Sequence, residues 1–249
     1  MPRVSDCKRD LIPTCDRKVQ FWSNQYNTFG MVPGPAPIGT CPGATLKEGG
    51  CWHVSRGKKL PECYACKITH CYGGVMRILK HNTRALARKT QPDMESLLTA
   101  EFASFRQTEL SHAKRTGTKA CLVYRLHWSG DLFSERYAKA LAKVVRKNSD
   151  ILFWNYTRSF KWISYFKNVP NLITYLSLDP VNKQEGMRVY KRWKTAIPNL
   201  RIAYMSKIND FQELKLISCP VDAGKLELTG GCARCGVCWK RNKHAWFAA

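Results

Sequence analysis

The chain has 249 residues, of which 41 are Lys or Arg and 18 are Asp or Glu, so its formal charge at pH 7 is +23. Hydrophobic residues make up 44% of the sequence, which is typical of a globular protein and excludes a disordered one. No apolar run approaches the ~20 residues that cross a bilayer, and the charged start of the chain lacks the apolar stretch of a secretory signal. We therefore expect a cytoplasmic protein with no membrane partner.

The positive charge and the cysteine content set this composition apart. A field of this sign attracts polyanions, so we expect a nucleic acid, DNA or RNA, as a partner. The twelve cysteines occur in a chain expected to lie in a reducing compartment. Clustered cysteines are more typical there of metal ligands than of disulfides.

Three parts are expected along the chain: an N-terminal extension and loop (1–40), a barrel-like α/β domain that carries the first cysteine cluster (41–218) and a Cys-rich, metal-binding tail (219–249). The Gly- and Pro-rich stretch 30–50 predicts an extended loop. The stretch 73–107 has helical periodicity.

Beyond it, short apolar runs alternate with helical segments. Strands are predicted at 120–126, 151–156, 172–178, 200–205 and 214–218, and helices are predicted from Ser134 and over 182–195. This alternation indicates parallel βαβ units. Because no dinucleotide fingerprint follows any strand, a complete or partial (βα) barrel is favoured over a doubly wound sheet.

Polar residues recur where each predicted strand ends. Ligands of parallel α/β folds bind at the carboxyl ends of the strands, so these residues are expected to line one mouth. The planar Arg158 guanidinium is suited to clamping a carboxylate or phosphate, and His127 or Asp131 to handling protons. The expected catalytic residues are His127, Asp131, Arg158 and Asp179, and the expected cofactor-binding residues are Gly130, Asn155 and Ser177.

The C-terminal cysteines form the strongest motif. Two consecutive C-x2-C steps bring three thiols into one short loop, with a fourth in Cys219-Pro220. Four thiolates suit a [4Fe–4S] cluster, and tetrahedral zinc uses the same ligands, so the spacing leaves the metal open. The expected ligands are Cys219, Cys232, Cys235 and Cys238.

A second group of cysteines lies nearer the N-terminus and leads directly into a predicted helix. It contains five cysteines, one more than a single site needs, so at least one of them is expected not to be a ligand. Together with the C-terminal group, one or two metal clusters are expected in the chain. The expected ligands of this group are Cys41, Cys63, Cys66 and Cys71, with Cys51 as an alternative.

The strings Cys41-Pro42-Gly43-Ala44-Thr45, Ser129–Ser134 and Phe153–Ser159, followed by the Cys-rich tail, resemble the phage "gene product eighty-eight" domain family over about residues 40–239. That family in turn resembles radical S-adenosylmethionine enzymes. The resemblance implies a partial βα barrel with an iron–sulfur cluster at its mouth and S-adenosylmethionine as a candidate ligand. It also implies Cys41 and either Cys63 or Cys71 as cluster ligands, and a chain expressed in an infected host cell.

Three functions are compatible with these observations. The first is an iron–sulfur enzyme that performs redox or radical chemistry on a nucleic acid or nucleotide. The second is a non-catalytic nucleic-acid-binding protein whose metals, such as zinc, only staple its loops. The third is a phage protein that binds a host complex. The G-x-S-x-G motif of serine hydrolases and the phosphate-binding P-loop are both absent from the sequence.

Overall fold

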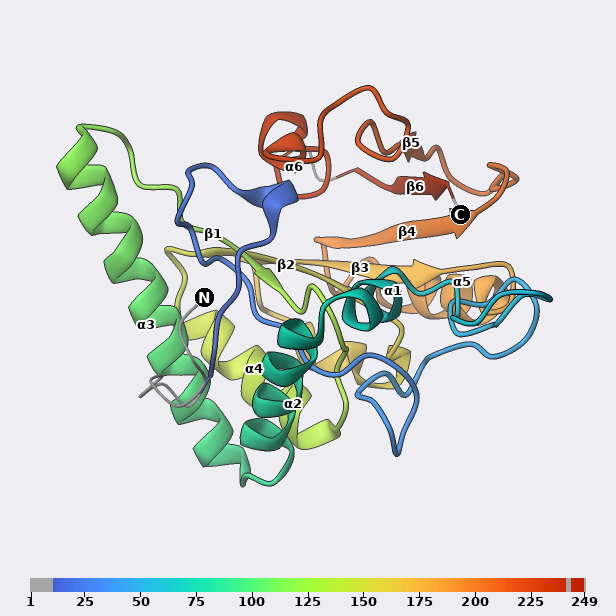
Figure 1. The fold of residues 1–249 in the computed structure, drawn as a ribbon, viewed down its shortest axis with the longest axis horizontal. Helices are drawn as coiled ribbons and strands as arrows, with labels where there is room; N and C mark the ends of the chain where they lie inside the picture. Colours follow the sequence, from blue (N-terminus) through green and yellow to red (C-terminus); the bar gives the residue numbers. More distant parts are fainter. Residues whose placement is uncertain (1–10, 241–242, 249) are drawn as a thin grey trace.

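The computed structural model describes residues 11–240 and 243–248, which form a mixed α/β fold around one parallel sheet (Figure 1). Six strands pair in the order β1-β2-β3-β4-β6-β5, and every pairing is parallel. The sheet is open, so a complete barrel is not what the chain forms. The strands are β1 (Val123–Leu126), β2 (Leu152–Thr157), β3 (Leu172–Leu178), β4 (Leu200–Ser206), β5 (Ile217–Ser218) and β6 (Ala245–Ala248).

Helical segments separate the strands as the alternation predicted. Ser134 caps α4, since its side chain accepts a hydrogen bond from the Tyr137 amide. The predicted helical stretch 73–107 is divided into two helices at Thr90, which begins α3 with a capping box. The helices are α1 (Tyr64–Cys71), α2 (Gly73–Ala87), α3 (Gln91–Thr116), α4 (Glu135–Lys147), α5 (Lys183–Trp193) and α6 (Gly231–Cys235), with short 3-10 segments η2 (Arg17–Val19) and η3 (Phe160–Phe166).

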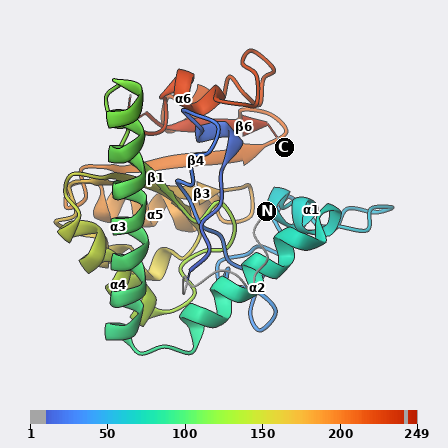
Figure 2. The same cartoon turned by 60° about the vertical axis from the view of Figure 1, so that its left-hand side comes forward.

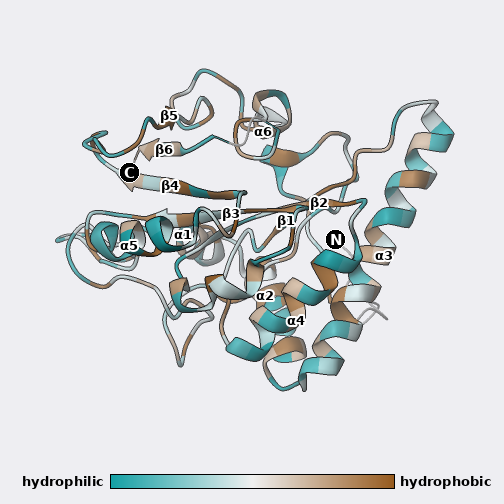
Figure 3. Ribbon diagram, turned by 180° about the vertical axis from the view of Figure 1, so that it is seen from behind, coloured by the Kyte–Doolittle hydropathy of each residue, from teal (hydrophilic) through white to brown (hydrophobic). Residues whose placement is uncertain are grey.

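The helices α3, α4 and α5 cover one face of the sheet, and Figure 2 shows α3 and α4 together on that side. Alternate strand residues such as Tyr124, Phe153 and Leu176 pack against them in the main hydrophobic core. The strands show as largely hydrophobic in Figure 3, as expected for a parallel sheet.

The opposite face of the sheet carries a smaller core. Trp154, Ile173 and Tyr175 belong to it, and Cys232 and Cys238 of the C-terminal tail pack against it. Because successive strand residues point to opposite faces, this second face is lined by the residues between those of the main core. It is the face on which the chain leaves a large cavity.

None of the described helices is long and apolar enough to cross a membrane.

Candidate functional site

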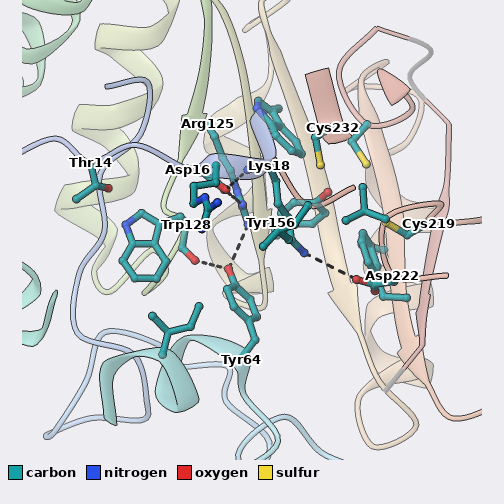
Figure 4. Close-up of a pocket in the computed structure, with 18 of the residues that line it drawn as sticks. Thr14, Asp16, Lys18, Tyr64, Arg125, Trp128, Tyr156, Cys219, Asp222 and Cys232 are labelled. Carbon is teal, nitrogen blue, oxygen red and sulfur yellow. Dashed lines mark hydrogen bonds and ion pairs between the residues drawn. The ribbon is translucent and has the colours of Figure 1, made fainter. Parts of the chain in front are cut away.

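A cavity of ≈ 810 Å³ lies on the second face of the sheet (Figure 4). The N-terminal segment, α1, α2 and the Cys-rich tail enclose it on the other sides. A volume of this order is typical of sites for cofactors and small molecules, ~300–1,000 Å³. The strand residues that line it alternate along the chain and include Arg125, Trp154, Tyr156, Ser177, Ala203, Met205, Ala245 and Phe247.

Arg125 is the charged centre of this cavity. Its guanidinium forms an ion pair with Asp16 and donates to the Tyr64 hydroxyl at 3.1 Å from Nη2. It also lies over two aromatic rings, 5.4 Å from the centroid of Trp154 and 5.5 Å from that of Tyr156. Tyr64 in turn donates to the Trp128 carbonyl oxygen. The aromatic rings make this wall flat and largely apolar, and the paired guanidinium adds hydrogen-bond donors to it.

The four C-terminal cysteines lie along the same cavity. Cys219, Cys232, Cys235 and Cys238 all line the cavity, and all are free thiols. Two glycines with positive φ, Gly230 (69°) and Gly236 (63°), begin and end α6 and give the tight turns that gather these side chains.

Burial and nearby charge define the environment of these thiols. Burial raises the pKa of Cys232 and of Cys238 to about 12. Arg125 and Lys18 oppose this effect at Cys232, because their positive charges favour its thiolate. The predicted C-terminal group therefore lies beside two cations that the cavity provides.

The N-terminal cysteine loop starts at the carboxyl edge of the same sheet. The segment 27–29 runs parallel to β1, with the Arg125 amide donating to the Asn27 carbonyl (2.9 Å) and the Trp128 amide to that of Phe29 (3.2 Å). The chain then enters the predicted loop and returns through α1. The loop thus occupies the position that follows a strand, where ligands of parallel sheets bind.

Four cysteines of this loop lie near one another and one does not. Cys41 is half-buried, and Cys51 and Cys63 are close enough to act electrostatically on its thiol, as Cys66 does on that of Cys63. Burial raises the pKa of the Cys41 thiol, and Asp131 raises it further. Cys71 is exposed at the end of α1.

Asp179 and Arg158, both predicted as site residues, hold this loop in place. The Asp179 carboxylate is fully buried and pairs with Arg158 Nη1 at 2.5 Å. Its Oδ2 also accepts from the Thr45 hydroxyl (2.6 Å) and from the Cys51 amide (3.1 Å). The pair therefore joins the end of β3 to the turn that carries Cys51.

Asp131 and Gly130, also predicted as site residues, lie in the segment that follows β1. Asp131 is buried and accepts from Thr157 Oγ1 and the Arg158 amide, each at 2.7 Å. Gly130 has φ +82°, and a Cβ there would lie 2.5 Å from Thr40 Oγ1, so no other residue fits without rearrangement. These residues organise the strand ends and do not line the cavity.

His127, Asn155 and Ser177 complete the predicted set. His127 is buried, its Nε2 lies 2.5 Å from the Tyr137 hydroxyl, and burial lowers its pKa to about 3. Asn155 is fully buried on the helix-covered face, with neither side-chain polar atom hydrogen-bonded. Of the three, Ser177 lines the cavity.

Residues missed by the sequence reasoning include Arg125 and Asp16. Arg125 follows the alternation of a strand whose two faces are both buried, and that pattern was visible in the sequence. Asp16 gave no such signal, because it reaches the cavity from a segment 109 positions away from Arg125.

Within residues 11–240 and 243–248, no group of three or more His, Cys, Asp and Glu side chains is arranged to hold a metal ion. The donor chemistry nevertheless fits a thiophilic metal, because each cysteine group offers four free thiols from one region.

An open parallel α/β sheet with a cavity between its second face and a cysteine-rich tail defines the class of this protein. The chain belongs to the Gene product 88 family, whose model matches residues 10–241. It is similar to the Gene 88 protein of Mycobacterium phage L5, with 29% identity over 197 residues (75% of this chain and 77% of that protein). It is also similar to the Gene 88 protein of Mycobacterium phage D29, with 31% identity over 198 residues and the same coverage. No solved structure matches the chain.

Proposed function

We propose that this phage-family protein is an iron–sulfur protein that carries out redox or radical chemistry on a nucleotide or a nucleic acid bound in its cavity. The observation that carries the proposal is the convergence of four free cysteines from the tail on one wall of a cavity of ≈ 810 Å³. Four thiolates are the usual ligand set of a [4Fe–4S] cluster. Cys219, Cys232, Cys235 and Cys238 would hold it.

The charges around the C-terminal thiols support an anionic cluster. Arg125 and Lys18 act on Cys232 from the cavity side, and neighbouring cations stabilise bound thiolates. A cluster at this wall would supply an electron to a ligand in the cavity.

The N-terminal loop supports a second cluster. Cys41, Cys51, Cys63 and Cys66 are the partly buried members of that group, and Cys71, which is exposed at the end of α1, is the spare cysteine in this proposal. A cysteine loop at the carboxyl edge of a parallel sheet is also what the resemblance to radical S-adenosylmethionine enzymes implies. This supports S-adenosylmethionine as a second candidate ligand, which would bind at this loop.

The other walls of the cavity suit a flat heteroaromatic group. Aromatic and apolar side chains such as Tyr156 and Phe247 line the cavity, and the Arg125–Asp16 pair offers both donors and acceptors to the polar edge of a base. In this role Arg125 orients the ligand, and the enclosing segments exclude water. The infected host cell is the proposed location of this activity.

Anaerobic purification with iron, sulfide, zinc and visible-spectrum analysis tests the proposal. We expect about eight irons per chain for two clusters and absorbance near 400 nm, with about four irons lost in the Cys232→Ser/Cys238→Ser variant. Cys41→Ser/Cys63→Ser should lose the other four. Cys121→Ser is the matched control, since Cys121 lies in neither group. Four irons in the wild type would leave one cysteine group structural.

Zinc in place of iron would refute redox chemistry and favour the alternative of a metal-stapled nucleic-acid-binding protein. A chain that binds neither metal would refute both.

A further inference from the structure

Helix α2 has two faces with opposite chemistry. Leu79, Asn82 and Leu86 are buried, and Val75, Ile78 and Leu79 line the cavity. Asn82 fixes the helix to the rest of the chain, because its side chain bonds both the amide and the carbonyl of Ile12 at 2.8 and 2.9 Å. The orientation of α2 is therefore defined, and so is the face that it turns outward.

The outward face is basic along its whole length. Four basic residues at positions i, i+3, i+7 and i+11 form a stripe on the side opposite the buried residues, and all four are exposed. At 1.5 Å per residue the stripe spans ~16 Å. We call it the α2 stripe; it consists of Arg77, Lys80, Arg84 and Arg88.

Among the residues that the structure describes, no acidic group pairs with the α2 stripe. The sequence contains no Asp or Glu between Glu62 and Asp93. In the described part of the chain, none of the four stripe residues makes an ion pair. Figure 2 shows α2 at the edge of the molecule.

Some basic residues of α3 and α4 pair with carboxylates: Arg106 with Asp150 at 2.6 Å and Lys143 with Glu95 at 2.6 Å. Other exposed cations of α4, such as Arg136, Arg146 and Lys147, make no ion pair within the described residues, so unpaired positive charge is not confined to α2. What distinguishes α2 from α3 and α4 is that it also forms a wall of the cavity.

Two exposed aromatic residues lie near the start of α2. Tyr72 directly precedes α2 and is 64% exposed, and Tyr64 is 51% exposed and lines the cavity. Basic residues that follow a phosphate backbone, combined with aromatic rings on which bases stack, are the usual means of binding single strands.

From these observations we infer that the α2 stripe binds the phosphate backbone of a single-stranded nucleic acid and leads one of its bases into the cavity. The inference rests on the proposed function in one respect: it names the substrate of the same cavity. The strand is single because a paired base must leave its duplex to enter an enclosed pocket.

The test is fluorescence anisotropy with labelled 20-nucleotide single strands of DNA and RNA over a salt series. The test variant is Arg77→Ala/Lys80→Ala/Arg84→Ala. The control is Arg136→Ala/Arg146→Ala/Lys147→Ala on α4, which removes the same charge from exposed helical positions. Alanine favours helix at all six sites, so both variants should fold.

We expect the α2 variant to lower the salt slope of log Kobs by about 2, since each lost phosphate contact contributes ~0.7. At 0.1 M salt this corresponds to roughly 100-fold weaker binding. The α4 control should bind like the wild type. Equal losses in both variants would show that only net charge matters and would overturn the inference, as would a wild-type protein that binds neither strand.

Metal analysis of the same preparations separates this inference from the proposed function. Binding that depends on α2 in a chain without iron would refute the iron–sulfur proposal and leave the α2 surface in place. Full iron content together with binding that the α2 variant does not weaken would support the iron–sulfur proposal and overturn the inference about the α2 stripe.

Discussion

The buried Arg158–Asp179 pair gives the sharpest prediction about stability. In Asp179→Asn the carboxylate loses its charge, so Arg158 keeps a buried positive charge without its partner. The side chains are 10% and 0% exposed, and therefore solvent cannot take over the role of the carboxylate. Breaking a buried pair on one side costs about 3–5 kcal/mol. We expect the free energy of unfolding to fall by that amount.

The same change should release the turn that carries Cys51. Asp179 Oδ2 accepts from Thr45 and from the Cys51 amide, and asparagine keeps at most part of these bonds. Urea unfolding at pH 7 measures the stability, and the reaction rate of the thiols with a disulfide reagent measures the release of the loop. We expect both to change together.

Asp150→Asn is the matched control. Asp150 also pairs with an arginine, at 2.6 Å, but its side chain is 47% exposed. Exposed pairs contribute about 0–1 kcal/mol, so this variant should unfold almost like the wild type. If Asp179→Asn loses less than about 1 kcal/mol, the reasoning that the pair secures the loop is refuted.

Two further predictions concern the strand ends. Gly130→Ala should lower the free energy of unfolding by about 3 kcal/mol or more, because the new Cβ would lie 2.5 Å from Thr40 Oγ1 and the backbone has φ +82°. The control Gly117→Ala has φ +66° but open space around it, so it should cost only about 1–2 kcal/mol. Equal melting temperatures of the two variants would contradict this prediction. The pKa of His127 is lowered to about 3 by burial, so below pH 6.5 the unfolded chain binds a proton that the folded chain does not, and stability falls as the pH falls. Between pH 7 and pH 5 this group should lower the free energy of unfolding by about 2 kcal/mol. Urea unfolding of His127→Asn should therefore show a smaller loss of stability over this pH range than the wild type. An identical loss would show that His127 does not titrate in this way.

Local sequence patterns determined much of this fold. The run Leu172–Leu178 is a strand with the predicted bounds, and Ser134 caps α4 as predicted, because strand and capping signals depend on residues near in sequence. The C-x2-C spacing likewise placed three thiols in one loop, since few residues separate them. In contrast, β6 (Ala245–Ala248) was not predicted, because a four-residue strand within a Cys-rich tail has too short a pattern to recognise.

Only the tertiary structure decided what lies around the cavity. The Arg125–Asp16 pair and the hydrogen bond between Cys51 and Asp179 join residues far apart in the chain. The sequence supplied the charges and the thiols, and it placed them on helices, strands and loops. Which of them share a wall depends on strand order and on the face to which each side chain points, and both are fixed by packing of the whole chain.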